Sequence, residues 1–253
     1  MNHMNKTTFE TEHYIFNFNE NSLAQKDIEV IAERQEGCFE HICRVLGTKP
    51  SFKIKYYLCD SPEEVGRAYG DNEPCNGFAD IPDKIYAVYN QNVKCIGFHE
   101  DAHVVSYTIN RPDSPAIREG LAMYFDRLWW GISNFAWTKY YMENGLFLPF
   151  DELMKSDFFF EQDCALTYPV VGAFTEWLIS AYGIDKYMVL YRQKDMFEAM
   201  KNVYGKSAKE LNAAFEKYAK LFDFDDSLTK RMSELLEEYG IRNQDLDNSK
   251  ESD

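Results

Sequence analysis

The sequence predicts an α+β fold, in which a small antiparallel or mixed sheet comes first and a mainly helical part follows. Two observations favour it. Apolar and polar residues alternate in several short segments before about residue 93, as they do in half-buried strands. From residue 94 to about residue 240, apolar residues recur at helical spacing. With 253 residues, the chain is long enough to bury a substantial core.

Strand patterns and helix signals follow one another in the first part. Ser22 and Gly47 are suitable caps for the long amphipathic segment between them. The sequence "SPEEVGRAYG" begins with a serine cap and a proline at the first helical position, which is typical of a short helix. We expect strands over residues 9–20 and 51–60, helices over 22–46 and 61–70, and two strands around a turn within 76–92.

Three glycines mark the expected ends of helices in the helical part. Gly183, Gly205 and Gly240 each stand where an apolar-periodic segment ends, as glycines at helix C-termini do. The sequence "NRPDS" at residues 110–114 is a loop signal. The expected helices are 94–109, 115–130, 149–159, 166–182, 184–204, 207–222 and 226–239.

No internal repeat or low-complexity linker divides the chain. We therefore expect one domain over residues 1–240, with an α+β subregion at residues 10–93 and a helical subregion at residues 94–240. The polar and acidic residues 241–253 are expected to form a disordered tail.

The charge excludes some classes of function. The formal net charge is −15, and such a surface repels nucleic-acid phosphates and anionic lipid. No run of 18 uncharged apolar residues is present, so no membrane span is expected. The N-terminal residues lack the pattern of a signal peptide. We expect a cytoplasmic protein, or a secreted or cell-surface one if the chain is a processed or truncated form.

The segment "HEDAH" carries the strongest functional signal. His99 and His103 are four residues apart on an expected helix, so both imidazoles project from one face and can reach one metal ion. Glu100 follows the first histidine, where it can take a proton from a metal-bound water. This is the H-E-x-x-H arrangement of zinc peptidases. The alternative is that both histidines are ordinary residues of a helix face.

A catalytic zinc site usually has three protein ligands and an open position. The next expected helix contains "SPAIREGLAMYFD", in which Glu119 is the best third ligand. The "NRPDS" loop lets the chain turn back, so that this helix can pack across the histidine helix. His99, His103 and Glu119 would then bind one Zn²⁺. The alternative for Glu119 is a solvated helix residue.

"HEDAH" followed by "REGLAMYF" resembles the gluzincin metallopeptidases, and more closely the peptidase-MA-like group. The segments at 166–192 and 204–218 resemble the downstream helices of that group more loosely. The resemblance implies a zincin-like metallopeptidase domain with His99, His103 and Glu119 as zinc ligands and Glu100 as general base. It also implies a peptide or protein substrate.

The resemblance implies further roles. Residues 84–90 would be the outer strand of the sheet, where Tyr86, Ala87 and Val88 bind an extended substrate. Tyr168 would stabilise the oxyanion, although it could also be a core residue.

One position departs from the family pattern. Thermolysin-like enzymes have an acidic residue four positions after the glutamate ligand, and this chain has Met123 there. Asp126, on the same helix face as Glu119, is a substitute partner for a metal ligand. Its alternative is a surface ion pair.

We therefore expect a zinc metallopeptidase. Two other readings are a non-catalytic zinc-binding or peptide-binding protein on the same fold, and a helical interaction protein in which the motif is accidental. Substrate preference and oligomeric state stay open.

Overall fold

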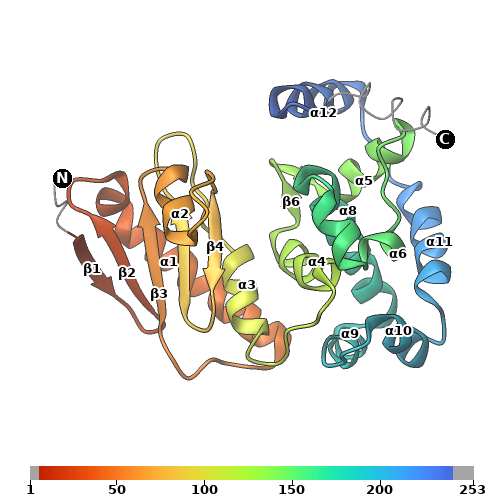
Figure 1. The fold of residues 1–253 in the computed structure, drawn as a ribbon, viewed down its shortest axis with the longest axis horizontal. Helices are drawn as coiled ribbons and strands as arrows, with labels where there is room; N and C mark the ends of the chain where they lie inside the picture. The colour runs from red at the N-terminus through yellow and green to blue at the C-terminus, as the bar shows by residue number, and fades with distance from the viewer. Residues whose placement is uncertain (1–5, 242–253) are drawn as a thin grey trace. The chain divides into compact units, whose positions relative to one another are not determined.

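The computed structural model describes residues 6–241. The chain divides into two compact units, Met1–Arg111 and Pro112–Asp253. The first contains a five-stranded mixed sheet with helices and the second is mainly helical, which confirms the expected α+β class (Figure 1). The boundary after Arg111 falls later than the junction expected after residue 93. Of the expected tail, residues 242–253 lie outside the described residues.

The sheet of the first unit has the strand order β1-β2-β3-β5-β4. Strands β2, β3 and β5 are parallel, and the two outer strands, β1 and β4, are antiparallel to their neighbours. The segment 9–20, expected to be one strand, contains the end of β1 and all of β2, because the chain turns back between them. The strands are β1 Lys6–Glu10, β2 Tyr14–Asn19, β3 Ile54–Cys59, β4 Gly77–Asp80 and β5 Lys84–Val88.

Three helices complete this unit: α1 Leu23–Leu46, α2 Pro62–Tyr69 and α3 His99–Ser106. The caps expected for α1 are confirmed. The Ser22 hydroxyl accepts a hydrogen bond from the Gln25 amide at 3.1 Å, and Gly47 ends the helix in the left-handed conformation with φ 64°.

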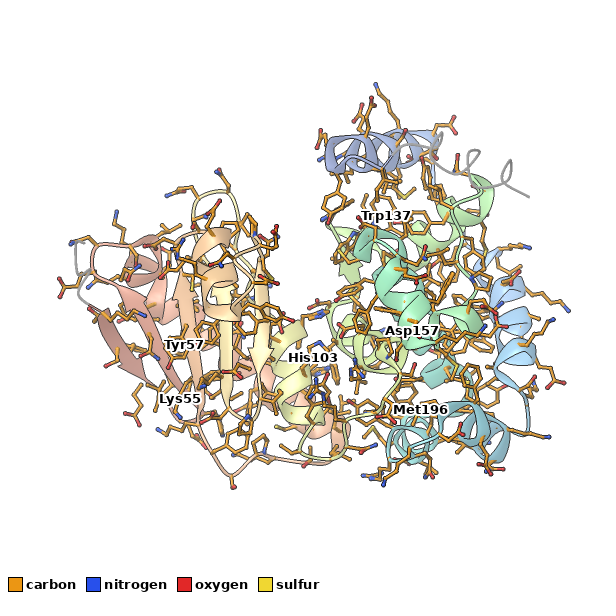
Figure 2. The ribbon with its side chains drawn as sticks, viewed as in Figure 1. Lys55, Tyr57, His103, Trp137, Asp157 and Met196 are labelled. Atoms are coloured by element: carbon orange, nitrogen blue, oxygen red, sulfur yellow. The ribbon has the colours of Figure 1, made fainter. Side chains whose placement is uncertain are left out.

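The two faces of the sheet bury different side chains. Tyr14, Phe16 and Tyr56 stack on the face that α1 covers and are at most 1 % exposed. On the other face, which α2 partly covers, Tyr57 stacks on Tyr86 at 4.5 Å between ring centroids. Figure 2 labels Tyr57 on β3. The alternation along each strand follows from the period of two in strand side chains.

Helix α3 begins later than the sequence predicts, at His99 instead of residue 94. The Cys95 amide pairs with the Val88 carbonyl at 2.8 Å, so residue 95 still extends the sheet. Gly97 then has φ 142°, which no helix accommodates. The "HEDAH" segment thus opens the helix directly after the sheet ends.

The second unit is built around two helices, α4 and α8, that cross closely. Trp137 of α5 is fully buried within this unit (Figure 2). The helices are α4 Pro115–Asp126, α5 Asn134–Glu143, α6 Phe150–Leu153, α7 Ser156–Glu161, α8 Cys164–Tyr182, α9 Ile184–Tyr191, α10 Met196–Tyr204, α11 Ala208–Ala219 and α12 Asp226–Tyr239, with a hairpin of β6 Leu128–Trp129 and β7 Ile132–Ser133.

Several expected helices of this part are shorter than predicted or are divided, as the one expected over 149–159 is into α6 and α7. The helix expected over 115–130 stops at Asp126, because Arg127 adopts φ 65° and its amide bonds back to the Met123 carbonyl. The helix expected over 184–204 is two helices, since Asp195 caps the start of α10 with its side chain.

Within the described residues the six cysteines form no disulfide, and Cys38 and Cys59 are the buried ones among them. Within residues 6–241, no helix is both long and apolar enough to cross a membrane.

Candidate metal centre

The two histidines of the "HEDAH" segment lie one turn apart on α3. Their ring centroids are 5.0 Å apart with an interplanar angle of 79°. His103 is only 7 % exposed, and His99 is half-buried at the first helical position. The expectation that both rings project from one helix face is therefore confirmed.

Glu119 lies in the middle of α4, and the glycine that follows it explains its placement. A Cβ on Gly120 would lie 2.4 Å from Thr175 Oγ1 and 3.0 Å from the Val171 carbonyl oxygen, both on α8. Gly120 therefore faces α8 at the helix crossing. Successive residues of a helix are about 100° apart, so Glu119 is turned away from that crossing.

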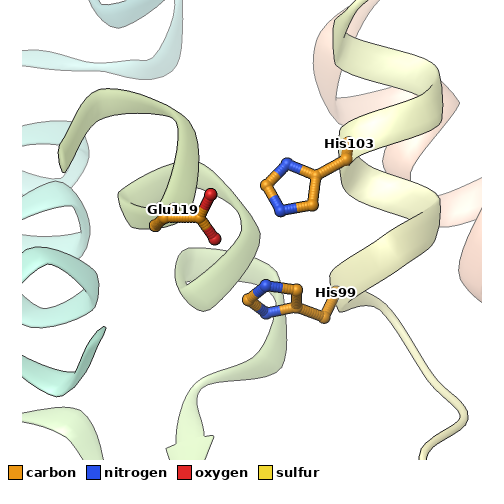
Figure 3. Close-up of side chains that lie close together, drawn as sticks. All are labelled: His99, His103 and Glu119. Atoms are coloured by element: carbon orange, nitrogen blue, oxygen red, sulfur yellow. The ribbon is translucent and has the colours of Figure 1, made fainter. Parts of the chain in front are cut away.

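His99, His103 and Glu119 form a group that could hold a metal ion. Each offers one ligand atom, and these three atoms lie within 4.8 Å of one another. Figure 3 shows the Glu119 carboxylate and both imidazole rings turned toward one another. Ligand atoms on one tetrahedral zinc ion are about 3.4 Å apart, which is within this 4.8 Å limit. Two imidazoles and a carboxylate are also a donor set that zinc uses in catalytic sites. The group fits a metal ion.

Glu100 lies on α3 beside the start of β4. Its Oε1 atom would be 3.4 Å from a Cβ on Gly77, and Cys95 Sγ would be 3.1 Å from the same point. The missing side chain at Gly77 leaves the space that the Glu100 carboxylate and the Cys95 thiol border. Among the described residues, Glu100 is not one of the three grouped ligands.

The expectation that residues 84–90 form the outer strand is wrong. Strand β5 is hydrogen-bonded to β3 on one side and to β4 on the other. The main-chain groups of Tyr86, Ala87 and Val88 are therefore used within the sheet and do not offer an edge to a peptide. The outer strand next to α3 is β4, which the sequence predicts as one of the two strands around a turn.

Tyr168 lies near the start of α8 and is half-buried. Its ring contacts Trp129 of the β6–β7 hairpin at 5.6 Å and Phe159 of α7 at 6.3 Å between centroids. It thus belongs to an aromatic cluster at the surface of the second unit.

Asp126 is the last residue of α4 and is half-buried. It is not one of the three grouped ligands. Met123 is 1 % exposed, and its Cβ would lie 2.7 Å from a Cβ on Gly172 of α8. Position 123 therefore faces the α4–α8 contact, where an acidic residue would be buried. This explains why the chain departs from the thermolysin-like pattern here.

No protein-family model matches the chain, and no curated protein matches its sequence. The candidate His-His-Glu metal group thus rests on the geometry of these three side chains.

Sequence reasoning missed a buried polar cluster behind the histidines. Asp101 is fully buried, and its Oδ2 accepts hydrogen bonds from the Tyr14 hydroxyl at 2.5 Å and from Gln35 Nε2 at 3.0 Å. The pKa of Asp101 lies well above its usual range, chiefly because the carboxyl group is buried. The hydrogen bond from Tyr14 lowers this pKa in part, and the neighbouring Glu100 charge raises it further. One signal was available: residue 101 lies about 200° around the helix from His99, so an aspartate there points into the protein.

Proposed function

We propose that this chain is a zinc-dependent metallopeptidase of gluzincin type, related to the peptidase-MA-like group. The observation that carries the proposal is the grouping of one ligand atom each from His99, His103 and Glu119 within 4.8 Å. These residues are separated along the chain in the H-E-x-x-H…E order of gluzincins. In this proposal residues 1–240 work as one zincin-like domain with one Zn²⁺.

Each proposed catalytic residue has a distinct task. A bound zinc ion would supply a Lewis acid that polarises the scissile carbonyl and lowers the pKa of a water. Glu100 would take a proton from the attacking water and pass it to the leaving amine. The glycine at position 77 supports this role, since a Cβ there would lie 3.4 Å from Glu100 Oε1 and Gly77 has none.

Tyr168 is proposed to donate a hydrogen bond from its hydroxyl to the oxyanion of the tetrahedral intermediate. Asp126 is proposed as the carboxylate that orients a metal ligand. Both assignments come from the family resemblance alone.

The substrate is proposed to be a peptide or protein that pairs with β4 in extended conformation. Strand β4 is the outer strand of the sheet on the side of α3, and one of its edges is unpaired within the described sheet. Its first residue, Gly77, lies next to the Glu100 carboxylate. A peptide added to β4 would therefore run past the general base. This replaces the expected contact with Tyr86, Ala87 and Val88.

Metal content tests the site. We expect about one equivalent of zinc per chain in purified, untagged wild-type protein by elemental mass spectrometry. Glu119→Ala should lose most of it, while Glu143→Ala, an exposed glutamate of α5 paired with Lys139, should keep it. A wild-type chain that holds no zinc after zinc is added would overturn the proposal.

Hydrolysis of a peptide library tests the reaction. Glu100→Gln should keep its zinc and lose cleavage, since the amide cannot accept the water proton. Cleavage at the wild-type rate in this variant would remove Glu100 as general base. A zinc-loaded wild type that cleaves no peptide would instead favour a zinc-binding protein without turnover.

A further inference from the structure

A set of three buried side chains holds α3 from the side opposite its histidines. Asp101 of α3, Tyr14 of β2 and Gln35 of α1 are all fully buried. The Tyr14 hydroxyl and Gln35 Nε2 both donate to the same carboxylate oxygen of Asp101. Hydrogen bonds are directional, so this contact fixes the rotation of the helix more narrowly than apolar packing does.

Gln35 also holds the chain before the helix. Its Nε2 donates to the Gly97 carbonyl at 3.0 Å, the same distance as to Asp101 Oδ2. Gly97 is two residues before His99 and Asp101 is two residues after it. One amide group therefore restrains the backbone on both sides of the first histidine.

The start of α3 lacks a side-chain cap. Phe98 occupies its N-cap position, and no side chain there makes a capping hydrogen bond. The helix has only eight residues, so it has little stability of its own.

Hydrogen bonds between neighbouring residues also hold the two donors, Tyr14 and Gln35, in place. His13, next to Tyr14, bonds through its main-chain amide to Glu36 Oε1 at 2.9 Å and through Nδ1 to Glu36 Oε2 at 2.5 Å. Glu36 follows Gln35 on α1, so β2 and α1 are joined directly beside the cluster. The Tyr14 hydroxyl is also within 3.1 Å of the Gln35 carbonyl oxygen.

We infer that Tyr14, Gln35 and Asp101 are positioning residues of the metal centre. They touch no ligand or reacting atom, and they act by holding α3 in the orientation in which His99 and His103 meet one metal ion. This inference rests on the proposed metal site and extends it. Residues that orient metal ligands typically change metal affinity by about 10- to 100-fold when they are replaced.

Two matched tyrosine substitutions test the inference. Tyr14→Phe removes the hydroxyl that bonds to Asp101, and Tyr141→Phe removes a hydroxyl that bonds to the Ala165 carbonyl at 2.6 Å in the second unit. Both tyrosines are fully buried, so each variant loses one buried hydrogen bond and keeps its ring. Zn²⁺ affinity is measured by competition with a chromophoric chelator, and metal-free stability by urea unfolding.

We expect Tyr14→Phe to weaken Zn²⁺ binding by about tenfold or more, and Tyr141→Phe to leave it within about twofold. Gln35→Met, which removes both donations at similar volume, should weaken binding further and change the visible spectrum of the Co²⁺-loaded protein. Asp101→Asn keeps an acceptor oxygen and should bind Zn²⁺ nearly as the wild type does.

Equal Zn²⁺ affinities in the two phenylalanine variants would overturn the inference, as would affinity losses that only follow urea stability. A wild type that binds no Zn²⁺ would overturn the metal site and this inference together. A wild type that binds Zn²⁺ but cleaves no peptide would overturn only the peptidase function, and the comparison of affinities would still decide the role of the cluster.

Discussion

Gly120 of α4 lies so close to Thr175 of α8 that a Cβ on residue 120 would fall 2.4 Å from Thr175 Oγ1. The Val171 carbonyl oxygen, at 3.0 Å from the same point, is backbone and cannot rotate away. We predict that Gly120→Ala lowers the free energy of unfolding by about 1–3 kcal/mol, because the helices must separate. Urea unfolding of the metal-free protein measures this.

Gly37 provides the control for that substitution. It lies within α1, and a Cβ there would have nothing within 4 Å. Gly37→Ala should stabilise the protein by about 0.5–1 kcal/mol, since alanine loses less backbone entropy in a helix. If Gly120→Ala were equally stabilising, the close crossing of α4 and α8 would be wrong.

Met123→Asp restores the acidic position of thermolysin-like enzymes but should not restore its function. The side chain is buried against Gly172, where a carboxylate finds no water. We predict a loss of about 3–5 kcal/mol in unfolding free energy and no gain in zinc affinity. Thermal unfolding and chelator competition check both parts. Tighter zinc binding in a stable variant would show that position 123 faces the metal.

Asp101 should make stability fall as pH rises. Its folded-state pKa is raised chiefly by burial, so between the ordinary value of about 3.9 and the raised value the folded chain binds more protons than the unfolded chain. The contribution of Asp101 to the free energy of unfolding is fully present below its unfolded-state pKa. It is lost as the pH rises to the folded-state pKa, by at most about 1.4 kcal/mol per pH unit.

The difference between wild type and Asp101→Asn isolates this contribution, because the amide does not titrate. Urea unfolding of the metal-free proteins from acid to neutral pH should show the wild type losing stability relative to the variant as pH increases. Parallel profiles would contradict the raised pKa.

Gly77→Ala should impair catalysis without removing the metal. The new methyl group would press on Cys95 Sγ at 3.1 Å and on Glu100 Oε1 at 3.4 Å. We predict a fall in kcat of roughly tenfold or less through displacement of Glu100, the proposed general base, with unchanged zinc content. Adding Cys95→Ala removes the nearest obstacle and should recover part of the loss. A double variant no better than Gly77→Ala would count against this explanation.

The sequence predicted those features that depend on residues close together in the chain, such as helix caps and the face of a helix on which a residue lies. The caps of α1 at Ser22 and Gly47 are adjacent to the helix they end, and both were correct. The spacing of His99 and His103 placed both rings on one face for the same reason. The start of α3 was wrong because it depends on Cys95 pairing with Val88, a contact that residue patterns do not encode.

Strand order was likewise beyond the reach of one sequence. The segment "KIYAV" is more apolar than "GFAD" and lies between β3 and β4, whereas the family resemblance predicts an edge position for it. The cluster around Asp101 was missed since its partners come from β2 and α1. Only the side of α3 on which Asp101 lies follows from the sequence.

The hydrogen-bond partners of Asp101 lie far from it along the chain, and this separation affects when the metal site can form during folding. Tyr14 and Gln35 precede Asp101 by 87 and 66 residues. An isolated peptide containing "HEDAH" would carry both histidines and Asp101, but neither Tyr14 nor Gln35, which hold its helix in place. Tight metal capture would then appear only once the sheet, α1 and the helix that carries Glu119 had folded, so a metal-sensitive dye could follow the completion of the metal site in real time.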